Sequence, residues 1–158
     1  MIFDSLDKAV CTFLEESSKI DKGEHHNDWW WGSELGMCKR KQCLRRLDLP
    51  ASNTKETRIM LIGKQGSLLH EWIEEVFGKL GMLVENEGKI VNESLRYRGR
   101  FDAIVKLKNG LSLIDIKSQR SEAFFKRKQR PEGQRVEEFQ KLQLASYVLF
   151  ARNKYPDL

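Results

Sequence analysis

Two aspartates and a lysine stand close together in residues 99–118, and such side chains can hold a divalent metal ion and stabilise negative charge. Asn109 and Gly110 form a strong hairpin signal, so we expect two short strands joined by a two-residue turn at these positions. In that register Asp102 lies opposite Lys117. Because side chains alternate with a period of two, Asp102, Asp115 and Lys117 then project from one face of the hairpin.

The opposite face of this hairpin is apolar, and we expect it to be the core face. Its residues are Phe101, Ala103, Val105, Leu107, Ile114 and Ile116. Two carboxylates and a lysine on an otherwise apolar sheet are costly to bury without a compensating charge, such as a metal ion. A one-residue change of register would turn side chains to the wrong face, so this prediction depends on the turn.

Two further residue pairs lie on predicted helices. Gly66 precedes His70 by about one helical turn, and a glycine allows another segment to approach closely. A helical histidine is more often structural, but His70 becomes a candidate metal ligand because two acids lie on the sheet that its helix would cover. Gln143 and Tyr147 are four residues apart and share a helix face, a pattern that ordinary amphipathic surface also produces.

Hydrophobic periodicity predicts the elements that must position these residues. We expect helices over residues 2–20, 33–49, 54–80, 121–128 and 136–152, and strands over 83–92 and 94–98 before the hairpin. Ser33 and Thr54 would cap two helices, Gly81 would end the long one, and residues 22–31 and 127–135 would be loops. The inward face of the long helix would comprise Ile59, Ile62, Leu69, Ile73, Val76, Phe77 and Leu80.

This order of elements predicts an α/β fold, with a small mixed sheet flanked by helices. The chain of 158 residues is expected to form one domain, 1–158, with an N-terminal helical segment over about residues 1–50. A net charge of +5 favours a polyanionic partner, although solubility alone explains it equally well. No apolar run has membrane length, no signal peptide is visible, and three cysteines indicate a reduced, cytoplasmic protein.

Four motifs, GxxxH, GRFD, DIK and QxxxY, follow one another in an order that resembles the PD-(D/E)XK nucleases. The similarity is to the RecB-like branch, which includes the CRISPR-adaptation exonucleases and their phage relatives, and it covers residues 33–147. Residues 38–41, Cys-Lys-Arg-Lys, are similar to the CxRK segment that opens many members. The resemblance implies a restriction-endonuclease-like core and a metal-dependent nuclease acting on single-stranded DNA or DNA ends.

The resemblance also implies a role for each matching residue. The metal ligands would be His70, Asp102, Asp115 and the Ile116 carbonyl. Oxygen ligands suit Mg²⁺ or Mn²⁺, and the histidine favours Mn²⁺. Lys117 would orient the attacking water or stabilise developing charge. Gln143 and Tyr147 would position the DNA strand, completing a catalytic set with Asp102, Asp115 and Lys117.

Basic residues offer phosphate contacts in two runs, 39–46 and 126–135, although either run could be a plain solvated face. The residues expected to contact nucleic acid are Arg40, Arg100, Lys126, Arg127, Lys128 and Arg130. The tryptophans at residues 29–31 could stack on bases, dock a partner protein or cover the core, and the sequence leaves these alternatives open.

The chain departs from the family pattern in three respects. The proline of the family name is absent before Asp115, and the GRFD segment that ends at Asp102 takes its place. Many relatives bind an iron–sulfur cluster, and Cys38 matches the early ligand. No cysteine follows Cys43, so a cluster would need ligands outside this chain. Relatives also continue with another strand after QxxxY, which indicates either that the end of the family core is missing here or that this is an unusually short member.

Two alternatives accompany the nuclease hypothesis. The chain could be a catalytically weak nucleic-acid-binding or assembly subunit of a phage or CRISPR-type complex, but the presence of both acids and the lysine favours an enzyme. His25 and His26 could bind zinc with Cys38 and Cys43, but their spacing fits no common zinc motif.

Overall fold

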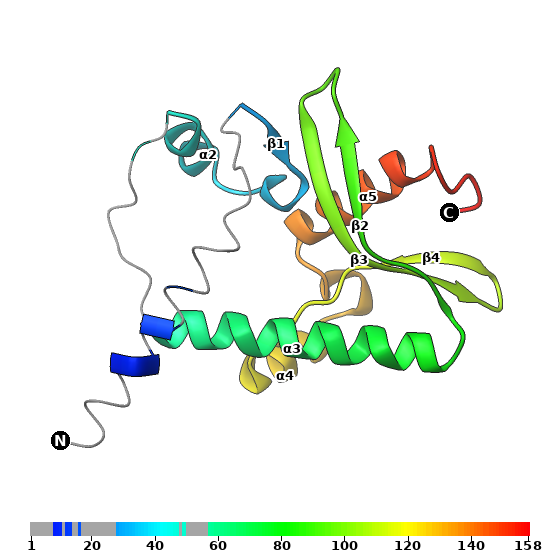
Figure 1. The fold of residues 1–158 in the computed structure, drawn as a ribbon, viewed down its shortest axis with the longest axis horizontal. Helices are drawn as coiled ribbons and strands as arrows, with labels where there is room; N and C mark the ends of the chain where they lie inside the picture. Colours follow the sequence, from blue (N-terminus) through cyan, green and yellow to red (C-terminus); the bar gives the residue numbers. More distant parts are fainter. Residues whose placement is uncertain (1–7, 11, 14–15, 17–27, 48, 50–56) are drawn as a thin grey trace.

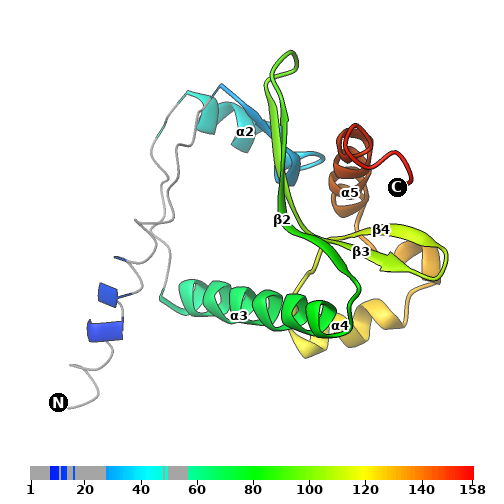
Figure 2. The ribbon, with the colours of Figure 1, turned by 45° about the vertical axis from the view of Figure 1, so that its right-hand side comes forward.

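The computed structural model describes residues 8–10, 12–13, 16, 28–47, 49 and 57–158. It has a mixed α/β architecture in which a small four-stranded sheet lies between helices (Figures 1 and 2). The elements in chain order are β1 (Trp30–Trp31), η1 (Gly32–Glu34), α2 (Lys39–Arg46), α3 (Thr57–Lys79), β2 (Leu83–Asn92), β3 (Tyr97–Leu107), β4 (Gly110–Ile114), α4 (Ser121–Lys128), η2 (Glu132–Gln134) and α5 (Glu138–Ala151). The α/β class and the mixed sheet agree with the prediction from the sequence.

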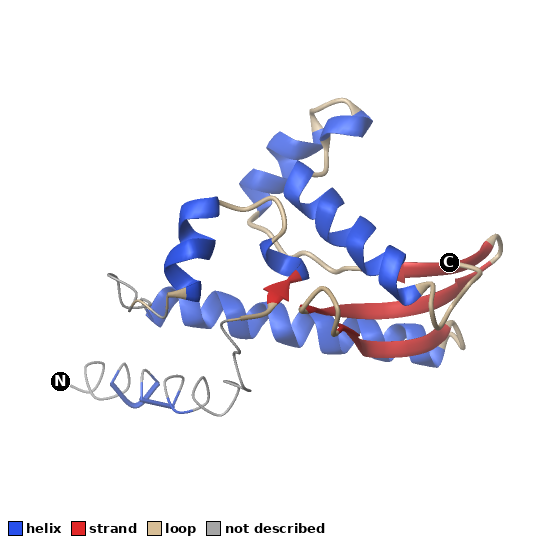
Figure 3. Ribbon diagram, turned by 90° about the horizontal axis from the view of Figure 1, so that it is seen from above, coloured by secondary structure: helices blue, strands red, loops and turns tan. Residues whose placement is uncertain are grey.

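Strand β3 is the centre of the sheet. β2 pairs with it in antiparallel fashion along one edge, from Leu83 to Asn92. The other edge is shared by two short strands: β1 pairs in parallel with Tyr97 and Arg98, and β4 pairs in antiparallel fashion from Ala103 onward. Residues 99–102 of β3 therefore lie in a gap between β1 and β4. Figure 3 shows the sheet from above, with the long helix α3 running beneath it.

The hairpin between β3 and β4 forms, but its register differs from the prediction. Leu107 pairs with Gly110, so the turn consists of residues 108–109 and Gly110 is the first residue of β4. Gly110 adopts a φ of 121°, which a residue with a side chain rarely adopts. The register is shifted by two residues, so every side chain stays on the face of the sheet predicted for it. Continued past Ile114, this register brings Asp115, rather than Lys117, opposite Asp102.

The core occupies both sides of the central strand, whereas the sequence predicted one core face. Ile104 and Val105 are successive residues that point to opposite faces, yet their exposed fractions are 0% and 1%. Leu107, predicted to be in the core, is exposed because it lies in the last pair of the hairpin, directly beside the turn. The main buried cluster joins the sheet to α5 through Ile90, Tyr97, Phe101, Ile104, Leu113, Tyr147 and Ala151.

Helix α3 matches its predicted range and ends before Gly81, whose φ is 64°. Its predicted inward face is only partly covered. Ile73, Val76 and Phe77 are half-buried, whereas four residues of that face are exposed, namely Ile59, Ile62, Leu69 and Leu80. The prediction was wrong at these positions because periodicity marks an apolar face without showing how much of it other elements cover. Thr54, its predicted cap, lies outside the described residues.

The N-terminal region differs most from the sequence-based prediction. Trp30 and Trp31 form a strand where a loop was expected, and the helix predicted from Ser33 begins only at Lys39. Gly36, with a φ of 75°, interrupts the helical path between η1 and α2, so Ser33 caps no α-helix. In the first predicted helix, residues 8–10, 12–13 and 16 are helical and the others lie outside the described part.

The remaining elements follow the prediction closely. β2 and α4 have the predicted bounds, and α5 is slightly shorter than expected. Residues 94–96 form a turn instead of the start of a strand, and part of the predicted loop 127–135 belongs to α4 and η2. None of the helices described here combines the length and the apolar character that crossing a membrane requires.

Candidate active site

Three chain segments bring together four residues that we call the acid–lysine cluster: His70, Asp102, Asp115 and Lys117. His70 comes from the middle of α3, and its Nδ1 lies 3.5 Å from Oδ1 of Asp102 on β3. Asp115 and Lys117 follow β4, and the Lys117 ammonium lies 3.1 Å from Oδ1 and 3.0 Å from Oδ2 of Asp115. The structure thus places the GxxxH, GRFD and DIK motifs side by side.

The segment after β4 is fixed by contacts on both sides. The Ile116 backbone N–H donates a hydrogen bond to Oδ2 of Asp102, beyond the point where the β3–β4 ladder ends. On the other side, a Cβ added to Gly66 would lie 3.2 Å from the Ser118 hydroxyl. The glycine of GxxxH therefore lets α3 pass close to the segment that carries Lys117, as its type predicted.

The Asp115 carboxylate is the most buried charged group of the cluster, with a side chain only 8% exposed. Burial raises the pKa of Asp115, and the hydrogen bond and charge of Lys117 lower it. The negative charge of Asp102 raises the pKa of Asp115 further, whereas His70 lowers it. The net shift is upward, so one lysine does not compensate fully for burial, and additional positive charge beside Asp115 would stabilise its ionised form.

Gln143 and Tyr147 reach the cluster from α5. The Gln143 side-chain amide donates to Oδ1 of Asp115 at 3.4 Å and to the Tyr147 hydroxyl at 3.0 Å. Both side chains are buried, with residue exposures of 5% and 2%. Burial raises the pKa of Tyr147, which keeps its hydroxyl neutral. In this structure the two side chains hold Asp115 in place, and their role in positioning a DNA strand stays a prediction.

The cluster offers the donor types that Mg²⁺ or Mn²⁺ takes, namely two carboxylates and an imidazole. Among the described residues, no three His, Cys, Asp or Glu side chains form a ready-made metal site. Asp102 is engaged by His70 and by the Ile116 N–H, and Asp115 by Lys117 and Gln143. The residues therefore have the right donor atoms for a metal ion and lie close to one another. Hydrogen bonds and ion pairs with neighbouring residues hold both carboxylates in place.

The basic residues expected to contact nucleic acid are not equivalent. Arg127 and Arg130 lie 3.5 and 3.1 Å from the Glu137 carboxylate, which also caps α5, so part of their charge is already compensated. Arg100 lies 3.7 Å from Glu87 across the sheet surface. Three others are exposed on helices, namely Arg40 on α2 and Lys126 and Lys128 on α4.

Cys38 lies at the exposed N-terminal end of α2, and Cys43 is exposed on the same helix. Both are free thiols. The iron–sulfur role of Cys38 stays a prediction, and so does the zinc alternative, because His25 and His26 lie outside the described residues.

The tryptophans before η1 stack on arginines, an arrangement that sequence reasoning missed. The Arg46 guanidinium lies 3.4 Å from the centre of the Trp30 ring, and the Arg98 guanidinium lies 4.1 Å from that of Trp29. We call Trp29, Trp30, Arg46 and Arg98 the Trp–Arg platform. Its members come from β1 and the residue before it, from α2 and from β3, so the only signal in the sequence was the abundance of arginine near the tryptophans.

Comparisons with protein-family models, with curated proteins and with solved structures found no match for this chain. The resemblance to the PD-(D/E)XK nucleases thus stays an inference from four motifs. The functional argument rests on the geometry of the acid–lysine cluster and on the charge around it.

Proposed function

We propose that the protein is a divalent-metal-dependent nuclease that hydrolyses phosphodiester bonds in DNA. The observation that carries this proposal is the buried Asp115 carboxylate, hydrogen-bonded to Lys117 and adjacent to Asp102 and His70. Acids, an imidazole and an ammonium group that converge from separate segments are typical of sites that act on phosphate esters.

Each residue of the cluster has a role that follows from its exposure. The Lys117 side chain is 42% exposed, so its ammonium can reach a phosphate and stabilise the charge that develops there. Asp115 orients that ammonium, and Gln143 orients Asp115. His70, Asp102, Asp115 and the Ile116 carbonyl would hold the metal. A bound Mn²⁺ or Mg²⁺ would polarise the scissile phosphate and lower the pKa of the attacking water.

The test is cleavage of end-labelled single-stranded and duplex DNA in Mn²⁺, Mg²⁺ or EDTA. Asp115→Asn and Lys117→Ala should each lower the cleavage rate about 10³-fold or more, since each removes charge stabilisation from the transition state. Lys108→Ala, an exposed lysine in the turn, serves as the charge-matched control and should cleave as wild type does. Cleavage by Asp115→Asn at the wild-type rate would refute the assignment.

Metal binding provides a second test, which does not depend on activity. Calorimetric titration with Mn²⁺ should show weaker binding by His70→Ala and by Asp102→Asn, because both residues would serve one ion. A metal-bound imidazole must be unprotonated, so protons should compete with Mn²⁺ and wild-type affinity should fall in acid. Unchanged Mn²⁺ affinity in His70→Ala would make the histidine a structural residue that supports Asp102.

A further inference from the structure

The two guanidinium groups of the Trp–Arg platform have unused hydrogen-bond donors. Within the described part of the chain, neither Arg46 nor Arg98 forms an ion pair. The buried Nη2 of Arg46 and the buried Nε of Arg98 each lack a hydrogen-bond acceptor. The adjacent Arg45 and Arg96, in contrast, pair with Glu34 and Asp28. No carboxylate among the described residues neutralises either guanidinium, so the charge of both arginines is available to an anionic ligand.

Stacking prepares these arginines for binding. The Trp30 and Trp29 rings fix the planes of the two guanidinium groups without using their N–H donors. A planar guanidinium that is already ordered loses little entropy when it binds phosphate with two parallel hydrogen bonds. The first turn of α2 adds further positive charge through Lys39, Arg40 and Lys41, with no acidic residue. The platform therefore has the donor geometry and the charge that a phosphate backbone requires.

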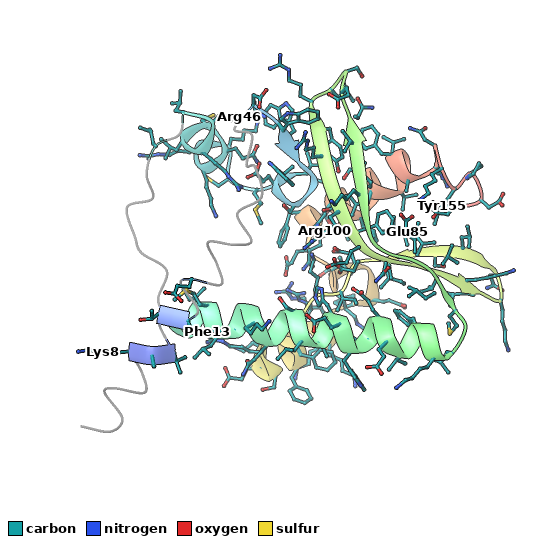
Figure 4. The ribbon with its side chains drawn as sticks, viewed as in Figure 1. Lys8, Phe13, Arg46, Glu85, Arg100 and Tyr155 are labelled. Carbon is teal, nitrogen blue, oxygen red and sulfur yellow. The ribbon has the colours of Figure 1, made fainter. Side chains whose placement is uncertain are left out.

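A line of positive charge connects the platform to the acid–lysine cluster. Arg98, Arg100 and Asp102 alternate along β3 and so project from the same face of that strand. At the rise of an extended strand, Arg98 and Asp102 are separated by about 13 Å. Glu87 on β2 pairs with Arg100 at 3.7 Å, and Lys89, opposite Arg100 on the same strand, restores a positive charge beside this line. Figure 4 shows Arg46 and Arg100 on the side of the sheet that carries α2 and α3.

We propose that the Trp–Arg platform binds the sugar–phosphate backbone of single-stranded DNA and directs the strand along β3 to the acid–lysine cluster. This inference deepens the proposed nuclease function and rests on it for the direction of the strand. A narrow row of separate cations fits one flexible strand better than a stiff duplex. Specificity for single strands follows from this shape, and the phosphate contacts are independent of base sequence.

The test is fluorescence anisotropy with 5′-labelled oligo(dT), in EDTA so that no cleavage occurs. The double variant R46Q/R98Q should bind at least about tenfold more weakly than wild type, since two arginine–phosphate contacts are lost. The slope of log affinity against log salt should decrease by about 1.4 for two single-strand phosphates. The matched control, R45Q/R96Q, removes the same charge from arginines that already have partners, and should change affinity less than about threefold.

Several outcomes would overturn this proposal. The first two are an equal loss of oligo(dT) affinity in the two double variants and wild-type affinity in R46Q/R98Q. The others are no binding of oligo(dT) by the wild-type protein, or a loss of affinity in R46Q/R98Q that is seen only with a labelled duplex. If circular dichroism shows that R46Q/R98Q does not fold, R46K/R98K retains the charge and tests the guanidinium geometry. It should bind oligo(dT) more weakly than wild type with little change in salt slope, and unchanged affinity would refute the platform.

The binding experiment and the cleavage experiment can refute the two proposals independently. If R46Q/R98Q loses affinity in EDTA but wild type cleaves no DNA with Mn²⁺, the platform is a DNA-binding site and the nuclease proposal is wrong. If wild type cleaves and R46Q/R98Q binds as wild type does, the nuclease proposal survives and the platform does not.

Discussion

The Asp115 carboxylate shows how a residue of a candidate site can reduce stability. Burial raises its pKa above the usual 3.8, and Lys117 offsets only part of this shift. Because the folded state holds the proton more tightly than the unfolded chain, stability decreases as the pH rises through this range. At neutral pH the ionised Asp115 is therefore a net cost to the folded protein, as expected for a site that awaits additional positive charge.

Replacing this carboxylate should stabilise the protein in the absence of metal. Asp115→Asn keeps a group that can accept from Gln143 but removes the buried charge, so its melting temperature near neutral pH in EDTA should exceed that of wild type. The difference should shrink as the pH falls and the wild-type carboxyl, whose pKa burial raises, becomes protonated. Thermal melts across this pH range provide the measurement.

Asp102→Asn is the comparison for this melting experiment. Oδ2 of Asp102 accepts from the Ile116 N–H, and Oδ1 lies beside His70. The substitution replaces one of these oxygens with an NH₂ group, so it should lower the melting temperature instead. If Asp115→Asn also melts below wild type at neutral pH, Asp115 is a structural residue whose pairing with Lys117 outweighs its burial.

At the scale of elements, the Tyr147 ring joins α5 to the sheet at the gap between β1 and β4. It packs against two glycines: a Cβ built on Gly32 would lie 2.3 Å from the ring, and one on Gly99 would lie 2.5 Å from it. The same tyrosine accepts the hydrogen bond of Gln143, so this packing also sets the position of the group that holds Asp115. Two glycines thereby couple the sheet edge to the candidate active site.

Gly99→Ala should destabilise the protein by about 1–3 kcal/mol, because the added methyl group overlaps a fully packed ring. Gly63→Ala on α3 is the matched control, since nothing lies within 4 Å of its added Cβ. A helical glycine-to-alanine change should raise stability by about 0.5–1 kcal/mol. Urea unfolding of both variants measures the difference, and a Gly99→Ala variant as stable as wild type would show that Tyr147 can move aside.

The hairpin illustrates what local sequence could and could not predict. Alternation of side chains placed Asp102 and Asp115 on one face, and the two-residue shift of register preserved that result. The turn was misplaced because Gly110 is used for its positive φ at the start of β4. Local pattern thus predicted the facing of the residues, whereas backbone conformation determined their partners.

Across the whole molecule, β3 carries the candidate functions in order from Arg98 to Asp102, with the Trp–Arg platform at one end and the acid–lysine cluster at the other. The cluster could be predicted because its motifs are local and their order is informative. The platform could not, because stacking of Arg46 on Trp30 depends on how α2 and β1 meet. The exposed residues of α3 show the same limit, since periodicity predicts an apolar face without indicating how much of it is covered.

Strand β1 has a consequence for the order in which the protein folds. It pairs with β3 through two residues, and the Trp30 N–H donates to the Arg96 carbonyl at 2.7 Å, far along the chain. Closing such a long loop is slow, so β1 should dock after the β2–β3–β4 meander has formed and should open before it. In native-state hydrogen exchange, the Trp30 amide should exchange at least about 100-fold faster than the amides of Ala103 and Val105.

Equal exchange rates would mean instead that β1 opens only when the whole molecule unfolds. If β1 docks last, the stacking of Arg98 on Trp29 forms only in chains that have completed folding. A partly folded chain would then contain the acid–lysine cluster but not the Trp–Arg platform. If the Trp–Arg platform binds single-stranded DNA as proposed, a partly folded chain would bind DNA more weakly than the folded protein.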